Sequence, residues 1–167
     1  TINARYIHAS LGLRWLYANL RELQPQACIQ EYCLTDQIAD MAEKILASQP
    51  AIVGIGVYIW NAAQVRQLVG MLKRVAPEVC VVLGGPEVSY ETEQQEICAL
   101  ADYVVTGEAD LAFADLCRRL LTRERPSEKI IVAPLPEFEE NAPQRAQRTQ
   151  REEQGKTLSL PFSVSSV

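Results

Sequence analysis

The stretch that decides the fold runs from AIVGIGVYIWN, residues 51–61, to VCVVLGGPEVS, residues 79–89. Residues 51–58 form an apolar run with almost no polar interruption, which is typical of a parallel strand that is covered on both faces. Residues 79–83 repeat this pattern, and residues 62–75 between the two runs have helical periodicity. The sequence therefore predicts a right-handed β-α-β crossover, with both turns at the sheet edge where open α/β sheets bind ligands.

The rest of the chain continues the alternation of strands and helices, so the predicted fold class is α/β. Further strands are predicted at residues 1–3, 27–32, 103–105 and 129–132, and further helices at residues 11–23, 37–48, 91–100 and 109–123. Asp36 or Thr35 can cap the helix that follows them. Residues 1–3 resemble the end of a strand, and we expect the first strand to be truncated.

The predicted α/β domain covers residues 1–133, and a linker or tail covers residues 134–167. From Pro134 onward the chain becomes acidic and then rich in Gln, Arg and Glu, a composition that buries too little apolar surface to offset its ordering entropy. We therefore expect a partly disordered tail. Its last stretch, residues 157–167, is apolar enough to add a strand where the truncated first strand leaves room.

Composition and charge argue against several classes of protein. Of the 167 residues, 48% are apolar, enough for one good core, and no run approaches the ~18 apolar residues of a membrane span. We expect a soluble, cytoplasmic protein without membrane contact, since no signal segment opens the sequence. A net charge of -5 argues against nucleic acid as a partner.

The cysteines are predicted to be core residues. They include no CxxC pair, which argues against a zinc or iron–sulfur site within the chain. We expect small apolar side chains in a reducing compartment at Cys28, Cys33, Cys80, Cys98 and Cys117.

Two predicted turns carry the most unusual residues. Gly84-Gly85-Pro86 follows a buried strand, and its two residues without side chains would let backbone amides approach a bulky or anionic ligand. A tight turn that needs positive φ explains the same residues without a ligand. The string YIWN ends the central strand with two aromatic rings and an amide. There Trp60 would be covered by a ligand, a partner or another loop, or would pack on its own helix.

Two further positions lie at the same predicted edge. His8, the only histidine, follows the first strand and is a candidate ligand-binding residue, although a lone histidine also makes plain surface or backbone hydrogen bonds. Gly107-Glu108 follows the strand at residues 103–105. Glu108 can accept a hydrogen bond from a ligand hydroxyl or cap the helix that begins beside it.

Four segments together resemble a known family. In chain order they are NARYIHASLGLRWLYANL, VYIWN, VLGGPEVS and DYVVTGEADLAF. In this order and at this spacing, they resemble the N-terminal cobalamin-binding domain of cobalamin-dependent radical SAM proteins. The resemblance covers roughly residues 1–123, and the combination of the segments is far more specific than any one of them.

The resemblance implies a flavodoxin-like (Rossmann-like) open parallel sheet of order 2-1-3-4-5 with helices on both faces. The corrin ring would lie over the carboxyl ends of the strands, and the nucleotide tail would reach into the sheet side. Carried over by position, the implied cofactor-binding residues are Asn3, Tyr6, His8, Ser10, Tyr58, Trp60, Asn61, Gly84, Gly85, Pro86, Glu87, Ser89, Thr106, Gly107 and Glu108. We expect none of them to act as a nucleophile or general base.

Two motifs of related proteins are absent from the sequence. The DxHxxG motif of methionine synthase and the mutases is matched by Tyr6, His8 and Leu11 only at the histidine, which leaves His8 as a candidate cobalt ligand. The CxxxCxxC string that holds the [4Fe–4S] cluster of radical SAM domains does not occur. The resemblance thus implies a cobalamin-binding module that presents its corrinoid to its own radical SAM domain, where S-adenosylmethionine and the [4Fe–4S] cluster bind outside this chain.

The resemblance also suggests what the longer enzyme does. Full-length relatives include methyltransferases and Mg-protoporphyrin monomethyl ester cyclase-like enzymes, whose reactions would take place outside this chain. Two other functions stay open. An FMN-binding or nucleotide-binding flavodoxin-like module shares this sheet and Gly-rich turn, although neither GxGxxG nor GxxxxGK[ST] occurs. A ligand-free protein-interaction domain would use Tyr58 and Trp60 to dock a partner.

Overall fold

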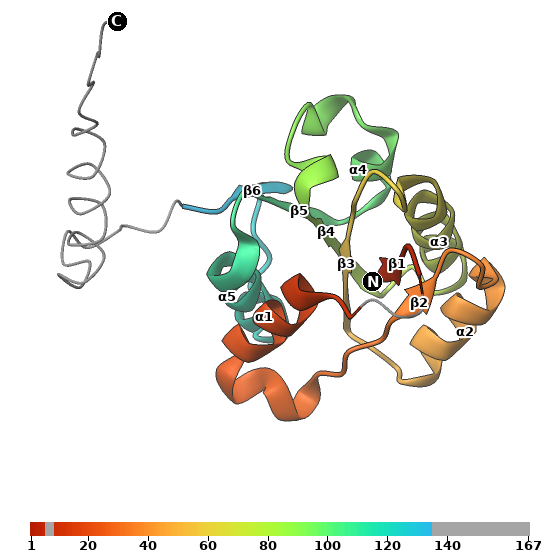
Figure 1. Ribbon diagram of the computed structural model, residues 1–167. Helices are drawn as coiled ribbons and strands as arrows, with labels where there is room; N and C mark the ends of the chain where they lie inside the picture. The colour runs from red at the N-terminus through yellow and green to blue at the C-terminus, as the bar shows by residue number, and fades with distance from the viewer. Residues whose placement is uncertain (6–8, 135–167) are drawn as a thin grey trace, which may run out of the picture. The chain divides into compact units, whose positions relative to one another are not determined.

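Strands alternate with helices along residues 1–5 and 9–134, the part of the chain that the computed structural model describes (Figure 1). The chain divides into two units, Thr1–Leu135 and Pro136–Val167, and the predicted tail lies almost entirely outside the described residues. The strands are β1 Ile2–Asn3, β2 Tyr32–Cys33, β3 Ile52–Gly56, β4 Cys80–Gly84, β5 Tyr103–Thr106 and β6 Ile130–Val132. The helices are α1 Leu11–Asn19, α2 Ile38–Ala47, α3 Ala62–Val75, α4 Glu96–Leu100 and α5 Ala109–Leu121, with short 3-10 helices η1 Arg21–Gln26, η2 Pro86–Val88 and η3 Thr92–Gln94. Among the described helices, none has the length and apolar character to cross a membrane.

The strands form two hydrogen-bonded groups. β3, β4, β5 and β6 pair in that order, β1 pairs with β2, and every pair is parallel. The predicted α/β architecture with parallel strands is therefore confirmed. These ladders contain the neighbours 2-1 and 3-4-5 of the predicted order, while the described residues contain no ladder between β1 and β3.

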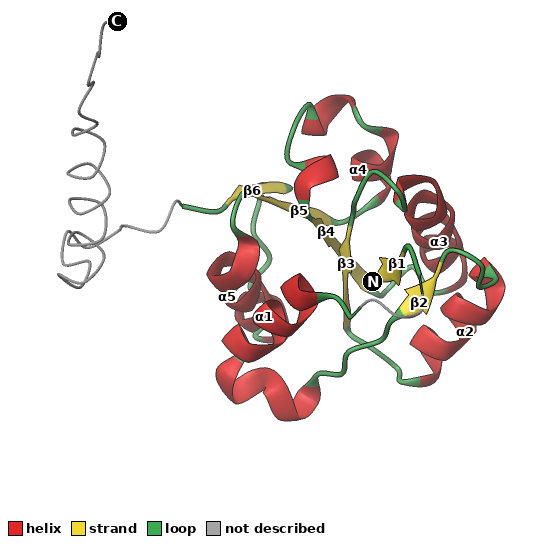
Figure 2. Ribbon diagram, in the orientation of Figure 1, coloured by secondary structure: helices red, strands yellow, loops and turns green. Residues whose placement is uncertain are grey.

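Helices cover both faces of the strands (Figure 2). α2 and α3 pack against each other on one face, where Val81 and Leu83 of β4 enter the larger hydrophobic core. α1 and α5 pack against each other on the opposite face, where Val82 of β4 and Val105 of β5 join the core under α5. Successive residues of β4 thus enter two different cores, which is why the strand has an uninterrupted apolar sequence.

The sequence predictions are wrong for several short segments. The helix predicted at residues 11–23 ends at Asn19, and Pro25 lies in a separate 3-10 helix. The helix predicted at residues 91–100 begins only at Glu96. Glu91 has a φ of 49°, in the left-handed region, and this conformation interrupts any helix there.

Two predicted details of residues 27–48 also need correction. Only the last residue of the strand predicted at residues 27–32 pairs, in β2. α2 begins without a side-chain cap, because the carboxylate of Asp36 accepts a hydrogen bond from the backbone N–H of Cys33 at 2.8 Å.

The cysteines differ in their surroundings. Cys98 and Cys117 are buried, and burial raises the pKa of the Cys117 thiol to about 12. Cys33 and Cys80 are half-buried, and burial raises the pKa of Cys80 to about 11. Cys28 is exposed, so the prediction of a core cysteine is wrong at that position.

Candidate functional site

Three turns meet at the carboxyl ends of the strands. The backbone N–H of Val57 donates to the carbonyl of Gly84 at 2.7 Å, which joins the turn after β3 to the turn after β4. The hydroxyl of Ser89 donates to the carbonyl of Gly85 at 2.9 Å and accepts from the backbone N–H of Gly107 at 3.3 Å. The turn after β5 is therefore tied to the same place, as the parallel topology predicts.

A cavity of about 300 Å³ opens beside these turns, on the face that α1 and α5 cover. Its floor includes three glycines of the central strands. Gly54 and Gly56 are two residues apart on β3 and so face the same side, and Gly56 lies opposite Gly84 in the parallel register. Gly54 is exposed, and the ring of Phe113 lies against it, because a β-carbon there would be 2.7 Å from Phe113 Cζ. A β-carbon on Gly56 would likewise lie 3.2 Å from Tyr58 Cε2, so the absence of side chains lets these two rings approach the sheet.

The walls of the cavity are mostly apolar side chains. Gly12, Leu13 and Leu16 line it from α1, and Phe113 lines it from α5. The ring of Tyr58 bounds it at the rim, because a β-carbon placed on Gly12 would lie 3.5 Å from the Tyr58 hydroxyl oxygen. The arrangement fits a flat, largely apolar group that enters between α1 and the sheet.

The cleft continues toward the amino ends of the strands. An adjoining cavity of about 500 Å³ shares Leu13, Leu16, Gly54 and Phe113 with the first. It extends under α1 to Ile52 at the start of β3. The space between α1 and the sheet is therefore longer than the rim cavity alone.

The YIWN segment combines an exposed aromatic pair with a buried amide. The rings of Tyr58 and Trp60 stack with centroids 4.6 Å apart and planes 8° apart, and Trp60 is 47% exposed. Trp60 thus packs on the ring of Tyr58 in the same turn, a contact that was not among the interpretations of Trp60 drawn from the sequence. Asn61 is fully buried and lies just before the first residue of α3. Its side-chain amide forms hydrogen bonds within the protein and thereby stabilises the rim. A direct contact between Asn61 and a ligand stays a prediction.

The two glycine turns have backbones that favour glycine. Gly85 has a φ of 107° and Gly107 a φ of 78°. Glu108 precedes the first residue of α5 and makes no side-chain capping hydrogen bond, so the predicted cap is wrong. Thr106 is buried at the end of β5. Glu108 is exposed beside the cavity and lines it, which leaves its carboxylate available to a ligand.

Of the remaining predicted cofactor-binding residues, some lie at the rim and others lie outside the described part of the chain. Pro86 and Glu87 form the short η2 helix after Gly85. Tyr6 and His8 lie outside the described residues, so the predicted cobalt ligand is untested. Within residues 1–5 and 9–134, no cluster of three or more His, Cys, Asp or Glu residues could hold a metal ion.

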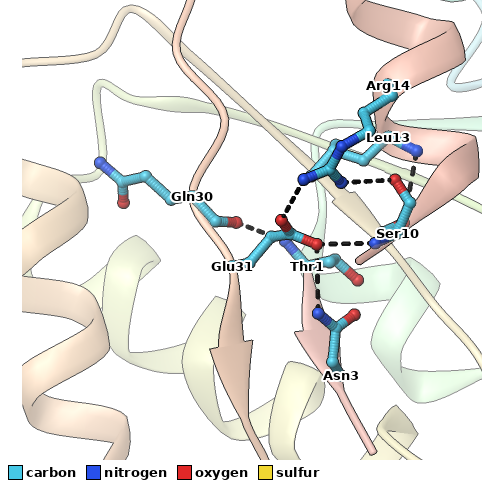
Figure 3. Close-up of polar contacts among 7 residues, drawn as sticks. All are labelled: Thr1, Asn3, Ser10, Leu13, Arg14, Gln30 and Glu31. Carbon is cyan, nitrogen blue, oxygen red and sulfur yellow. Dashed lines mark hydrogen bonds and ion pairs between the residues drawn. The ribbon is translucent and has the colours of Figure 1, made fainter. Parts of the chain in front are cut away.

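Glu31 forms a polar cluster next to the cavity (Figure 3). Its carboxylate accepts hydrogen bonds from the Arg14 guanidinium at 2.8 Å, from the backbone N–H of Ser10 at 2.7 Å and from the Asn3 amide at 3.2 Å. The side chain of Ser10 in turn caps α1 by accepting from the backbone N–H of Leu13 at 3.3 Å. The Arg14 and Ser10 hydrogen bonds lower the pKa of Glu31 to about 2.

We expect Glu31→Gln to cost stability at neutral pH and progressively less in acid. The pKa of Glu31 is about 2 in the folded protein and close to 4.5 in the unfolded chain, so its stabilisation is complete above pH 4.5. It is lost as the pH falls from about 4.5 to 2. Urea unfolding at pH 7, 4 and 2.5 measures this change. Glu22→Gln removes an exposed carboxylate paired with Arg118 and should cost less at pH 7, and equal losses for both variants at that pH would contradict the expectation.

The residues that form the cavity itself were not predicted from the sequence. Gly12, Leu13, Gly54, Gly56 and Phe113 were treated as ordinary helix or strand residues, yet they line the cleft. One signal was present in the sequence: glycines at alternate positions of a central strand lie on one face, and a β-strand rarely places two there without reason.

Comparison with known proteins gives one family and one curated relative. The family profile described as B12 binding domain matches residues 1–117. A protein of Pyrococcus horikoshii named as an uncharacterized methyltransferase is 31% identical over 107 residues, which cover 64% of this chain and 23% of that protein. The chain therefore spans about a quarter of the length of this relative.

Solved structures are also similar to this chain. The N-terminal domain of a hypothetical protein from Thermotoga maritima is 18% identical, with a TM-score of 0.47 over 77% of this chain and 97% of that one.

Proposed function

The chain belongs to the B12-binding domain family, and we propose that it is the cobalamin-holding module of a longer radical SAM enzyme. In this proposal β1 lies beside β3 in one sheet of order 2-1-3-4-5. The corrin ring rests over the three converging turns, and the nucleotide tail enters the cavity between α1 and the sheet. The observation that carries the proposal is the cavity between α1 and the sheet, which lies beside the three converging turns and is lined by Gly54, Gly56 and Gly84.

The residues of the cavity fit such a tail. A planar base needs a slot with apolar walls, and here Leu13 and Leu16 line the cavity from α1, with the rings of Phe113 and Tyr58 against the glycines of the sheet. The corrin ring is wide and flat, which suits a rim of turns and stacked aromatic rings. Tyr58 and Trp60 are already stacked on each other, so little ordering of their side chains would be needed on binding.

The protein's share of the chemistry is binding, orientation and shielding. The bound cobalt would supply the reactive centre, carrying a methyl group or an electron to the radical SAM domain. Gly84 and Gly107 would let the backbone approach the corrin edge closely, and Glu108 can accept a hydrogen bond from a polar group at that edge. Two observations support a methyltransferase as the longer enzyme: the similarity to a relative of that name, and the small part of that relative that this chain spans.

Visible spectroscopy tests the proposal directly. The full chain is mixed with hydroxocobalamin or, separately, with FMN, then desalted, and the spectrum of the protein fraction is recorded. We expect the corrinoid bands to be retained and the flavin bands to be lost. Retained FMN would favour a flavodoxin-type module, and a protein fraction without either chromophore would contradict the proposal for this chain.

We expect Gly12→Leu to weaken hydroxocobalamin binding by at least about tenfold, which corresponds to about 1.4 kcal/mol. The new side chain would project toward Tyr58 and close the cavity mouth, because a β-carbon on Gly12 already lies within 3.5 Å of the Tyr58 hydroxyl. Gly70→Leu is the matched control, since Gly70 lies on α3 with nothing within 4 Å of its β-carbon position. Both variants should fold, because leucine is a good helix former. Dissociation constants from spectral titration decide, and unchanged affinity in Gly12→Leu would place the tail elsewhere.

A further inference from the structure

We infer that Glu31 is a positioning residue for the cavity, and that its carboxylate sets the place of the α1 wall relative to the sheet. This inference rests on the proposed function, because it concerns the same cavity. The carboxylate holds two points of the chain that are seven positions apart: the Asn3 amide at the end of β1 and the Ser10 backbone N–H at the start of α1. Both ends of the segment that joins β1 to α1 are thereby fixed on one anion.

The anchoring reaches the cavity through the first turn of α1. Ser10, Gly12 and Leu13 line the cavity, whereas Glu31 is not among its lining residues. Ser10 connects them: its N–H bonds to Glu31, its side chain caps the Leu13 N–H, and its carbonyl accepts from Arg14 at 2.9 Å. A change at Glu31 therefore acts on the wall indirectly.

The electrostatics of the cluster make the carboxylate hard to replace. Its hydrogen-bond partners among the described residues are all donors: the Arg14 guanidinium, the Ser10 N–H and the Asn3 amide. A glutamine in this place would offer only one acceptor oxygen and would turn its own NH₂ group toward one of these donors. Charge-assisted hydrogen bonds are roughly twice as strong as neutral ones, so the amide would hold the helix start less firmly.

Two corrinoids separate a positioning role from a general structural one. Hydroxocobalamin carries the nucleotide tail, and dicyanocobinamide has the corrin ring without the base. In Glu31→Gln we expect the affinity for hydroxocobalamin to fall about tenfold, which is about 1.4 kcal/mol, and the affinity for dicyanocobinamide to stay within about twofold. Glu22→Gln, which disrupts an exposed pair with Arg118, should change neither. Equal losses for both corrinoids, or no loss for either, would overturn the inference.

A measurement on the ligand-free protein keeps the inference separate from the proposed function. Amide exchange by NMR should be at least about tenfold faster at Ser10 and Leu13 in Glu31→Gln, because these two N–H groups depend on the cluster. The increase in α3 should be smaller, because its amides open only with global unfolding. A wild-type chain that retains no cobalamin would refute the proposed function, and amide exchange would then decide whether Glu31 fixes α1. Unchanged exchange at Ser10 would overturn the inference whatever the corrinoid data show.

Discussion

Replacing Gly85 by alanine should destabilise the protein by about 3 kcal/mol or more and lower its melting temperature by roughly 10 °C. Gly85 has φ 107° and ψ 171°, a region that is open almost only to glycine. A β-carbon there would lie 2.6 Å from the carbonyl oxygen of Val57 and 3.0 Å from its nitrogen. Both contacts are with backbone in the turn after β3, so neither can be relieved by rotating a side chain.

Gly70→Ala is the matched control for this prediction. Gly70 lies within α3, nothing lies within 4 Å of its β-carbon position, and alanine is favoured over glycine inside a helix by about 0.5–1 kcal/mol. The same chemical change should therefore stabilise the protein at residue 70 and destabilise it at residue 85. Thermal unfolding of the two variants against the wild type measures both signs. A Gly85→Ala loss below about 1 kcal/mol would mean that the turn can move away from Val57.

The result bears on how Gly84-Gly85-Pro86 should be interpreted. The sequence left two explanations open, a close approach to a ligand and a tight turn with positive φ. The backbone of Gly85 and its packing on Val57 require glycine whether or not a ligand is present. Gly84 differs, because its β-carbon would meet only the carbonyl of Val105 at 3.4 Å and its backbone lines the cavity. The ligand explanation therefore depends on Gly84 more than on Gly85.

Long, strongly periodic elements could be predicted from the sequence. α3 begins and ends at the predicted residues, 62 and 75, because its apolar stripe is regular and faces a buried core. The convergence of the turns after β3, β4 and β5 also followed from the sequence, since parallel strands place their carboxyl ends at one edge. Neither inference needed knowledge of contacts between distant residues.

The rest depended on partners that no local pattern contains. The alternating residues 27–32 suit a strand, but a ladder is no longer than its partner, and β1 has only Ile2 and Asn3 to pair with β2. Leu111 fits the apolar stripe of α5 in the sequence, yet it is 63% exposed, whereas the buried residues of that helix are Ala114, Leu116 and Cys117. Burial at such positions follows from tertiary packing and not from periodicity.

The cavity was missed for a related reason. A glycine pair such as Gly54 and Gly56 has no distinctive sequence neighbours in an apolar strand. Its meaning emerges only when Gly84 is placed beside Gly56 by the register and α1 is placed over the floor. The anchor at Glu31 is equally hidden, because it brings Asn3 and Ser10 together through a residue more than 20 positions away in the sequence.

Replacing Asn61 by aspartate should cost roughly 4 kcal/mol at pH 8, the range for an uncompensated buried charge with unsatisfied neighbours. Asn61 is fully buried, and its NH₂ group donates to the carbonyls of Ile2 at 3.0 Å and Gly56 at 3.2 Å. Its oxygen accepts from the backbone N–H of Tyr58 at 2.8 Å. Aspartate has the same shape but would turn a carboxylate oxygen toward the two carbonyls, so both would lose their donor and repel the new charge.

The loss should affect more than overall stability. The bond from Asn61 to Ile2 links β1 to the end of β3, and the bond to Tyr58 fixes the start of the YIWN turn. We expect faster amide exchange at Tyr58 in Asn61→Asp. Asn19→Asp is the control: its amide donates to the Trp15 carbonyl at the exposed end of α1, and the same change should cost less than about 1 kcal/mol there.

The pH dependence of the Asn61→Asp variant gives the sharpest test of this geometry. Burial and the two facing carbonyls would raise the pKa of the new carboxyl in the folded state above its value of about 4 in the unfolded chain. Between the two pKa values, the folded variant then binds more protons than the unfolded variant. Its deficit in unfolding free energy relative to wild type should therefore shrink as the pH falls, by up to about 1.4 kcal/mol per pH unit in that interval. Denaturant unfolding of both proteins at pH 8, 6 and 5 measures the difference. A deficit that is the same at all three pH values would mean that the carboxylate has found solvent, and that Asn61 does not hold β1 to β3 as its hydrogen bonds indicate.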